Sequence, residues 1–301
     1  MDDMVCHNDL VQYDSDGRSI RRRCPTRLRC MVAFLTMFVF ALGGAWGHAE
    51  DDDDGGPDKG EKTSTKVDVF FQELFMGQIA YPQDKGEIQF STGFFQNSDD
   101  KREDTLPVVL EYGVTDYFQV AAAVPVDFKH HEEVASGVGN IELLAYWNFL
   151  NNPKTGWMSG VGFGVGLPAA SPDVGDRAFL YEPFCILGRQ VGKTGVNVSA
   201  GLEIKDYLDD EEKTEVKGDI AAGIYRQFDH CVPLLELGVE VEREKTTVRL
   251  APGLYWQPAW TEAEIGVSLP IGLTRETPDF GVWVLATMEF QPNGHKDSDD
   301  D

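Results

Sequence analysis

The sequence predicts an all-β protein, a transmembrane antiparallel up-and-down β-barrel of about 12 strands after a cleaved signal peptide. Three observations lead to this prediction. Apolar and polar residues alternate in run after run, the turns between runs are alternately short and long, and aromatic residues gather near one end of the runs. The last run, Phe280–Phe290, is the clearest, because its apolar side chains fall on every second residue, as in a strand with one apolar face.

Residues 1–49 are predicted to be a secretory signal peptide with a long basic n-region. The run Met31–Trp46 is apolar, arginines precede it, and Gly47-His48-Ala49 follows with small residues at the cleavage positions. A membrane-anchoring helix is the alternative, but the run is shorter than the ~20 residues that a bilayer span needs. The rest of the chain divides into an acidic linker and periplasmic lead-in (50–85), the barrel (86–290) and an acidic C-terminal tail (291–301).

The lead-in contains one apolar stretch, Val67–Ala80, whose pattern is ambiguous. Val67, Val69 and Phe71 alternate as in a strand, whereas Phe70, Phe71, Leu74 and Phe75 also fit one stripe of a helix. The stretch is therefore interpreted either as a lead-in on the periplasmic side or as a plug inside the barrel.

The barrel itself is predicted from twelve alternating runs separated by turn residues. Most of them have the ~9–11 residues that a tilted strand needs to cross a bilayer. The runs span residues 86–97, 105–113, 117–129, 138–150, 156–168, 178–190, 194–207, 214–228, 232–244, 247–257, 262–273 and 279–290.

The connections between the runs differ in length on the two sides. Those on the periplasmic side, such as 191–193 and 229–231, are short, whereas most of the others, such as 169–177, are longer and acidic. A soluble β-sandwich also has alternating strands, but it does not account for this asymmetry. Aromatic residues at the periplasmic ends are expected to form an interfacial girdle: Tyr112, Phe118, Trp147, Phe149, Trp157, Trp256 and Phe290.

The second face of each strand is expected to line the barrel interior. Acids outnumber bases on it, which predicts a passage that disfavours anions and admits cations or neutral solutes. An interior packed with paired charges that conducts nothing is the equal alternative. The candidate lumen-lining residues are Glu111, Gln119, Asp127, Asn140, Glu142, Asn197, Glu203, Lys217, Asp219, Glu236, Glu240, Arg249, Glu264 and Glu289.

No catalytic constellation, cofactor motif or metal site is recognised. The formal net charge of −25 argues against nucleic-acid binding. His130 and His131 stand beside two glutamates but no serine, which is more typical of a solvated loop than of a metal or hydrolase site. The glycines of the run 160–166 are interpreted as inward strand positions that leave room in the lumen. Cys185 and Cys231 are the two cysteines after residue 49, and a single bridge between them stays open.

Three short motifs resemble a known family. Glu111-Tyr-Gly-Val-Thr-Asp116, Gly137-Val-Gly-Asn-Ile141 and Gly166-Leu-Pro168 follow one another at the ends of strands. In that order they resemble the outer-membrane transporter-like family called MetA-pathway of phenol degradation, with Asn140 where that family usually has Asp. The resemblance implies an outer-membrane β-barrel and a link to the uptake or export of small, often hydrophobic molecules. It implies no catalytic residues.

These features together predict a barrel in the bacterial outer membrane that is not an enzyme and needs no cofactor. The expected function is a channel or transporter for small molecules, hydrophobic or aromatic ones included. The alternative is a non-conducting structural or surface-interaction barrel. The expected partners are outer-membrane lipid, the barrel-assembly machinery and a small-molecule solute, and no nucleic acid.

Overall fold

The computed structural model describes residues 11–13, 19–21, 66–67, 69–71, 73–98, 103–129, 136–170, 174, 178–208, 214–243, 245–258, 260–261 and 263–290. Strands β1 (Val11–Tyr13) and β2 (Ser19–Arg21) pair antiparallel as a sheet of their own. Most of the predicted signal peptide, the linker up to residue 65, the loop histidines 130 and 131, and the tail lie outside the described residues. Those assignments stay predictions.

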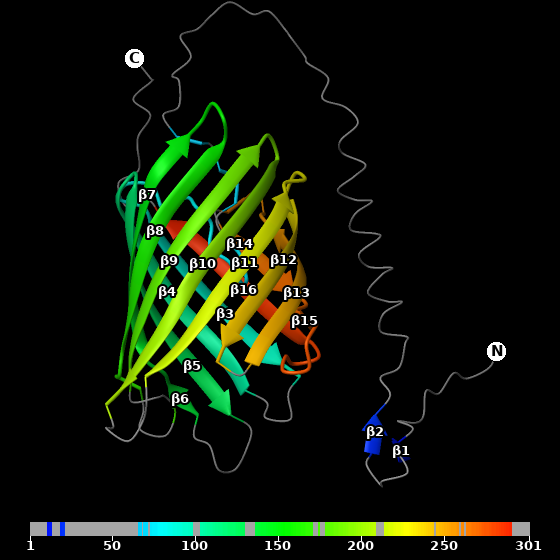
Figure 1. The fold of residues 1–301 in the computed structure, drawn as a ribbon. Helices are drawn as coiled ribbons and strands as arrows, with labels where there is room; N and C mark the ends of the chain where they lie inside the picture. Colours follow the sequence, from blue (N-terminus) through cyan, green and yellow to red (C-terminus); the bar gives the residue numbers. More distant parts are fainter. Residues whose placement is uncertain are drawn as a thin grey trace, which may run out of the picture. The chain divides into compact units, whose positions relative to one another are not determined.

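The predicted barrel is confirmed. Fourteen segments form one antiparallel sheet, and β16 pairs with β3 and β12 with β13, so the sheet closes on itself (Figure 1). The segments are β3 (Ile88–Asn97), β4 (Glu103–Thr115), β5 (Phe118–Lys129), β6 (Gly137–Val138), β7 (Ile141–Asn152), β8 (Trp157–Leu167), β9 (Ala178–Val191), β10 (Thr194–Tyr207), β11 (Glu215–Arg226), β12 (Cys231–Glu242), β13 (Lys245–Trp256), β14 (Ala263–Ser268), β15 (Ile271–Gly272) and β16 (Gly281–Phe290).

Two of the barrel strands are each split into two segments, so the fourteen segments make twelve strands. Strands β6 and β7 both pair with β5 and are separated by Gly139 and Asn140. Strands β14 and β15 both pair with β13 and are separated at Pro270, which has no N–H to give to the ladder. Each predicted run coincides with one of the twelve strands to within two residues at either end.

The outward face of the barrel is apolar. Large apolar side chains stand exposed on it, among them Leu110 (51%), Phe163 (47%) and Ile220 (53%). Phe280, directly before β16, and Phe290 at its end are exposed as the alternation predicts, whereas Trp283 between them is buried. An apolar surface that continues around a closed barrel suits contact with lipid and not with water. No helix among the described residues is long and apolar enough to cross a bilayer.

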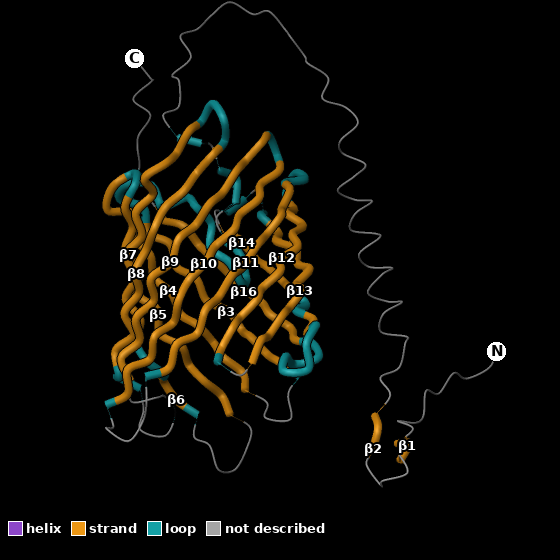
Figure 2. Tube along the Cα trace, in the orientation of Figure 1, coloured by secondary structure: helices purple, strands orange, loops and turns teal. Residues whose placement is uncertain are grey.

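The two ends of the barrel differ. The turns β4–β5, β7–β8, β9–β10, β11–β12 and β13–β14 lie at the upper end in Figure 2, whereas the opposite end has the longer connections and one short turn, between β12 and β13. At the upper end, Gly156 (φ 70°) and Gly192 (φ 54°) adopt the left-handed conformation that tight turns require and that glycine allows without steric cost. We call the upper end the short-turn end and the opposite one the long-loop end. Six of the seven aromatic residues predicted for the girdle are exposed near the short-turn end, Trp147 most of all at 55%, while Phe118 is only half-buried.

The described residues from 66 to 83 lie inside the barrel, and we call them the plug. They form neither the strand nor the helix between which the sequence left the choice. Figure 2 shows them as loop segments within the ring of strands. The chain then turns at Gly86 (φ 84°), where Glu87 N donates to Asp84 O (2.9 Å), and enters β3.

Candidate functional site: the plugged barrel interior

The structure places the fourteen predicted lumen residues on the inner face, at two levels. The first level lies in the short-turn half, where the plug fills the interior: Glu111, Gln119, Asn197, Glu236, Glu264 and Glu289. The second lies in the long-loop half: Asp127, Asn140, Glu142, Glu203, Lys217, Asp219, Glu240 and Arg249. The two levels have different chemistry and are described in turn.

At the first level an apolar core joins the plug to the barrel wall. Phe71 (1% exposed) packs between Tyr225 and Tyr255, with ring centroids 5.1 and 4.8 Å away. Phe75 packs on Tyr255 at 5.0 Å. Burial of one phenylalanine of this kind stabilises the docked plug by about 1.5–3 kcal/mol. The wall contributes six inward apolar residues to this core: Tyr225, Val232, Leu234, Tyr255, Trp283 and Leu285.

These inward apolar residues were not predicted, because the inner face was expected to be polar along its whole length. A signal for them exists in the sequence. Val232 and Leu234 alternate with Pro233 and Leu235, so that the start of β12 is apolar on both faces. A strand half with two apolar faces indicates apolar material on the inside as well as lipid on the outside.

The plug turn Phe75–Gly77 is held by one carboxylate of the wall. The backbone N–H of Phe75 donates to Glu236 Oε2, and those of Met76 and Gly77 donate to Glu236 Oε1, each at 2.9 Å. Glu236 is 1% exposed. Three N–H groups on one carboxylate are charge-assisted hydrogen bonds, which are about twice as strong as neutral ones.

Amide side chains of the wall satisfy the rest of the plug backbone. Asn197 Oδ1 accepts from Ala80 N (3.3 Å), and Asn148 Nδ2 donates to Ala80 O. Gln119 Oε1 accepts from Gln83 N (2.9 Å). Irregular backbone at membrane depth is tolerated where protein groups satisfy it in this way. Four of the predicted lumen residues of this level, Glu111, Gln119, Asn197 and Glu236, therefore bind the plug.

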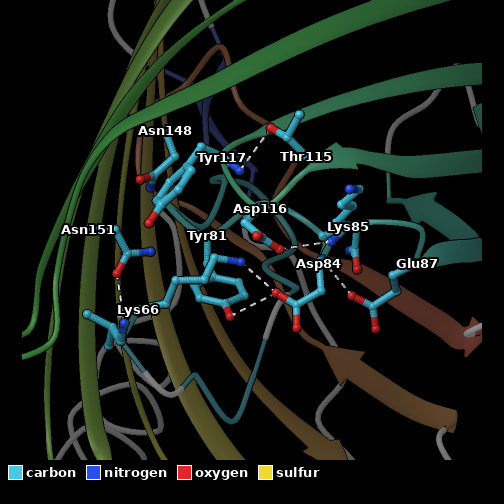
Figure 3. Close-up of polar contacts among 12 residues, drawn as sticks. Lys66, Tyr81, Asp84, Lys85, Glu87, Thr115, Asp116, Tyr117, Asn148 and Asn151 are labelled. Carbon is cyan, nitrogen blue, oxygen red and sulfur yellow. Dashed lines mark hydrogen bonds and ion pairs between the residues drawn. The ribbon is translucent and has the colours of Figure 1, made fainter. Parts of the chain in front are cut away.

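The neck of the plug is fixed at the short-turn end, as Figure 3 shows. Asn151 Oδ1 accepts from Val67 N (2.7 Å). Lys66 Nζ lies 2.5 Å from Asp84 Oδ1 and 4.8 Å from the centroid of the Tyr81 ring. These contacts join the first described plug residues to the turn that leads into β3.

The inward glycines of β8 do not leave open space, which corrects the interpretation made from the sequence. A Cβ on Gly160 would lie 2.3 Å from the Tyr146 hydroxyl, and one on Gly162 would lie 2.0 Å from the Phe184 ring. The rings of the two neighbouring strands therefore occupy the room that the glycines provide. Both rings belong to the packing around the plug.

A carboxylate of the plug, Glu73, lies beside a carboxylate of the wall, Glu111, and both are half-buried. Gln89 Nε2 donates to both, at 2.8 Å from Glu111 Oε2, and Ser91 Oγ donates to Glu73 Oε1 at 3.0 Å. Gln119 Nε2 donates to Glu111 Oε1 at 2.7 Å. Burial, and next the negative charge of Glu111, raise the pKa of Glu73 well above its usual range. The sequence did not indicate Glu73 or Gln89.

The Glu73→Gln variant is expected to flatten the pH dependence of stability in metal-free detergent buffer. Folded Glu73 keeps its proton at pH values where an exposed glutamate, with a pKa of about 4.3, has lost it. The free energy of unfolding therefore falls as the pH rises from about 4 toward the raised pKa, because the folded state binds more protons than the unfolded state. Urea titrations at several pH values measure this slope. A slope unchanged in Glu73→Gln would contradict the assignment, and Gln78→Ala, an exposed plug position, is the control.

The second level, in the long-loop half, is charged and reached by water. Arg249 Nη1 lies 3.0 Å from Glu240 Oε1, and Lys217 Nζ lies 3.6 Å from Glu240 and 3.5 Å from Glu203. These four side chains are 21–33% exposed although they point into the barrel. The interior is therefore reached by water at this level, whereas the plug occupies it at the first level.

Three further acids of the second level have no ion pair within 4 Å among the described residues: Glu142, Glu182 and Asp219. They lie close enough to Glu203 to interact with its charge. Glu182 was not predicted, because the alternation of β9 is poor in the sequence. Its inward neighbours include Ile186, which packs on the plug and makes that face look apolar.

No group of three or more His, Cys, Asp or Glu side chains in the described part of the chain is arranged to hold a metal. Cys185 and Cys231 are both free thiols, so the bridge that the sequence left open does not form. The interior thus consists of a plug, a level of polar and apolar contacts around it, and an acidic level beyond it that water reaches.

Comparison with known proteins gives a likeness of fold. No protein-family model matches the chain, and no curated protein does. The NanC porin aligns with a TM-score of 0.50 at 7% identity, over 67% of this chain and 98% of that one. The KdgM porin aligns with a TM-score of 0.48 at 13% identity, over 66% of this chain and 99% of that one. A second structure is of KdgM porin in complex with disordered oligogalacturonate.

The chain is therefore a closed antiparallel β-barrel with the fold of the NanC porin. At this level of identity the likeness concerns the fold and not the solute. The motifs that resemble the MetA-pathway of phenol degradation family are not supported by a family match.

Proposed function

We propose that this protein is a bacterial outer-membrane channel for small neutral and cationic solutes, in which the plug closes the periplasmic half of the passage. The observation that carries the proposal is the contrast between the two faces of the barrel. The outside is apolar and exposed, whereas the inside of the long-loop half is acidic and wet. A wall of this kind separates water from lipid, whereas in a protein surrounded by water its apolar outer face would be unfavourable.

The charge balance of the wet level supports a preference for cations. At this level the five acids Glu142, Glu182, Glu203, Asp219 and Glu240 outnumber the three bases that form ion pairs with them, Lys205, Lys217 and Arg249. Acidic rings attract cations and repel anions in channels. Because of the family resemblance, small aromatic molecules are included among the solutes of the liposome-swelling assay.

Replacing the three unpaired acids together (Glu142→Gln, Glu182→Gln, Asp219→Asn) is expected to reduce cation selectivity severalfold. The variant has nearly the same side-chain volumes but loses the negative charge of three acids that have no ion pair within 4 Å among the described residues. The ratio of cation to anion permeability, measured from reversal potentials in a salt gradient across a planar bilayer, reports the change. Asp116→Asn, at an exposed short turn, is the matched control and should leave the ratio as it is.

The channel proposal is tested by conductance and by solute uptake into liposomes. Discrete current steps in the wild type, and swelling of liposomes in neutral, cationic or aromatic solutes, are the expected results. If neither the wild type nor a variant with a weakened plug shows current steps at any voltage, the channel proposal is wrong.

A non-conducting structural or surface-interaction barrel is the second candidate, and one observation favours it. Glu236, Asn197 and Gln119 of the wall bind the plug backbone, and the plug packs in an apolar core in which Phe71, Tyr225 and Tyr255 are almost fully buried. A plug that never leaves would make the barrel a rigid membrane anchor for its loops. The same conductance measurement separates the two candidates.

A further inference from the structure

A polar cavity of about 110 Å³ lies where the plug meets the wall. Glu73 of the plug and Glu111 of β4 line it, together with Gln83, Gln119 and Tyr146 among others. A cavity of this volume has room for several waters or for a hydrated ion. It lies at the first level and is separate from the wet acidic level of the proposed passage.

The carboxylates at this cavity have no basic partner. Among the described residues, no Lys, Arg or His forms an ion pair with Glu73, Glu111 or the neighbouring Glu264. The groups that do reach Glu73 and Glu111 are the neutral donors Gln83, Gln89, Gln119 and Ser91. Buried charges in proteins are normally paired or bind a metal, because an unpaired charge is expensive to bury.

A second observation also points to a ligand. Gln83 is 2% exposed, and its Oε1 is buried without a hydrogen-bond partner. Its Nε2 donates to Gln89 Oε1 at 2.6 Å, which leaves the carbonyl oxygen of the same amide free. A buried acceptor without a donor is costly, so its presence beside two carboxylates favours a positive group at this place.

We propose that this cavity is a binding site for one divalent cation of the calcium type, coordinated by Glu73, Glu111 and Gln83 Oε1 and completed by water. The donors are all oxygens, and carboxylate, amide carbonyl and water are the ligands that calcium takes in proteins. Two carboxylates balance the charge of one divalent ion. The flexible coordination of Ca²⁺ suits an irregular cavity better than the strict octahedron of Mg²⁺.

The site has a consequence for the plug, because its two carboxylates come from different parts of the fold. Glu73 belongs to the plug and Glu111 to the wall, so a shared cation clamps one to the other. Without the ion, the two negative charges repel each other or must bind a proton. Bound cation should therefore stabilise the plugged state, and binding should strengthen as the pH rises, because the ligands must be deprotonated.

Calcium binding to the purified full chain in detergent tests the proposal, by isothermal titration calorimetry and by the calcium-dependent rise of the thermal transition. We expect one saturable site in the wild type and a Ca²⁺ affinity lowered on the order of tenfold or more in Glu73→Gln and in Glu111→Gln. Gln83→Leu removes the amide oxygen without a change of charge and should also weaken binding. Heat-modifiable migration in detergent gels establishes that each variant is folded.

Controls separate this site from the acidic remainder of the chain. Glu142→Gln removes a carboxylate from the wet level and should leave the affinity unchanged. Weak calcium binding that persists equally in Glu73→Gln and Glu111→Gln would overturn the proposal, since it would come from acids elsewhere. A protein stabilised by lower pH in chelator but not by Ca²⁺ would also overturn it, in favour of a proton. None of these outcomes depends on whether the barrel conducts.

Discussion

The Glu236→Gln variant is expected to release the plug and raise the open probability of the channel by about a hundredfold. The wild-type carboxylate accepts three backbone N–H groups of the turn Phe75–Gly77. Glutamine has nearly the same shape, but it has one acceptor oxygen, no charge, and an NH₂ group that must face an N–H of the turn. The loss is about 3 kcal/mol in the docking of the plug, and every 1.4 kcal/mol is a factor of about ten in the equilibrium.

Single-channel recording measures the open probability, and limited proteolysis of the plug gives an independent measurement of its release. Glu240→Gln is the matched control, because Glu240 lies on the same strand and the same face but binds Lys217 and Arg249 instead of the plug. That variant should change selectivity without changing the open probability. Equal open probabilities in Glu236→Gln and the wild type would show that Glu236 does not hold the plug.

The Phe71→Ala variant is expected to destabilise the docked plug by about 3–5 kcal/mol, which is typical of a buried aromatic truncated to alanine. Phe71 is 1% exposed and lies between two tyrosine rings, so its removal leaves a cavity that the rigid barrel wall fills poorly. The temperature at which the protein changes its migration in detergent gels should fall, and the open probability should rise.

Gln78→Ala is the control for Phe71→Ala, because Gln78 belongs to the same plug and its side chain is exposed. It should behave as the wild type in both measurements. A Phe71→Ala protein as heat-resistant and as closed as Gln78→Ala would mean that the plug core contributes little. Glu236 and Phe71 hold neighbouring parts of the same segment, so their effects are expected to be coupled and not additive.

The barrel wall could be predicted closely because its two faces meet different media. Lipid on one side and a polar interior on the other impose a period of two on every strand, and that period is local in the sequence. The limits of the twelve predicted runs therefore agree with the strand limits to within two residues. The alternation of polar and apolar residues alone assigned Glu203 and Arg249 to the inner face.

The prediction was weakest where the inside of the wall is not wet. The start of β12 and the middle of β9 have apolar residues on both faces. Their inward residues are apolar because they contact the plug and not water. In the same region the inward glycines of β8 were interpreted as open space, but Tyr146 and Phe184 fill it. Both errors have one cause. The alternation along a strand indicates which residues point inward, but it does not indicate whether water or another part of the chain contacts them.

The sequence by itself determined the fold class and the number and limits of the strands, since each of these depends on a repeat between near neighbours. The tertiary structure alone decided the conformation of the plug and the role of the residues around it. The plug has no period, because its backbone bonds to Asn148, Glu236 and Gln119 from strands far away in the chain. Only the closing of the barrel brings Glu73 to Glu111, and no spacing along the sequence records that contact.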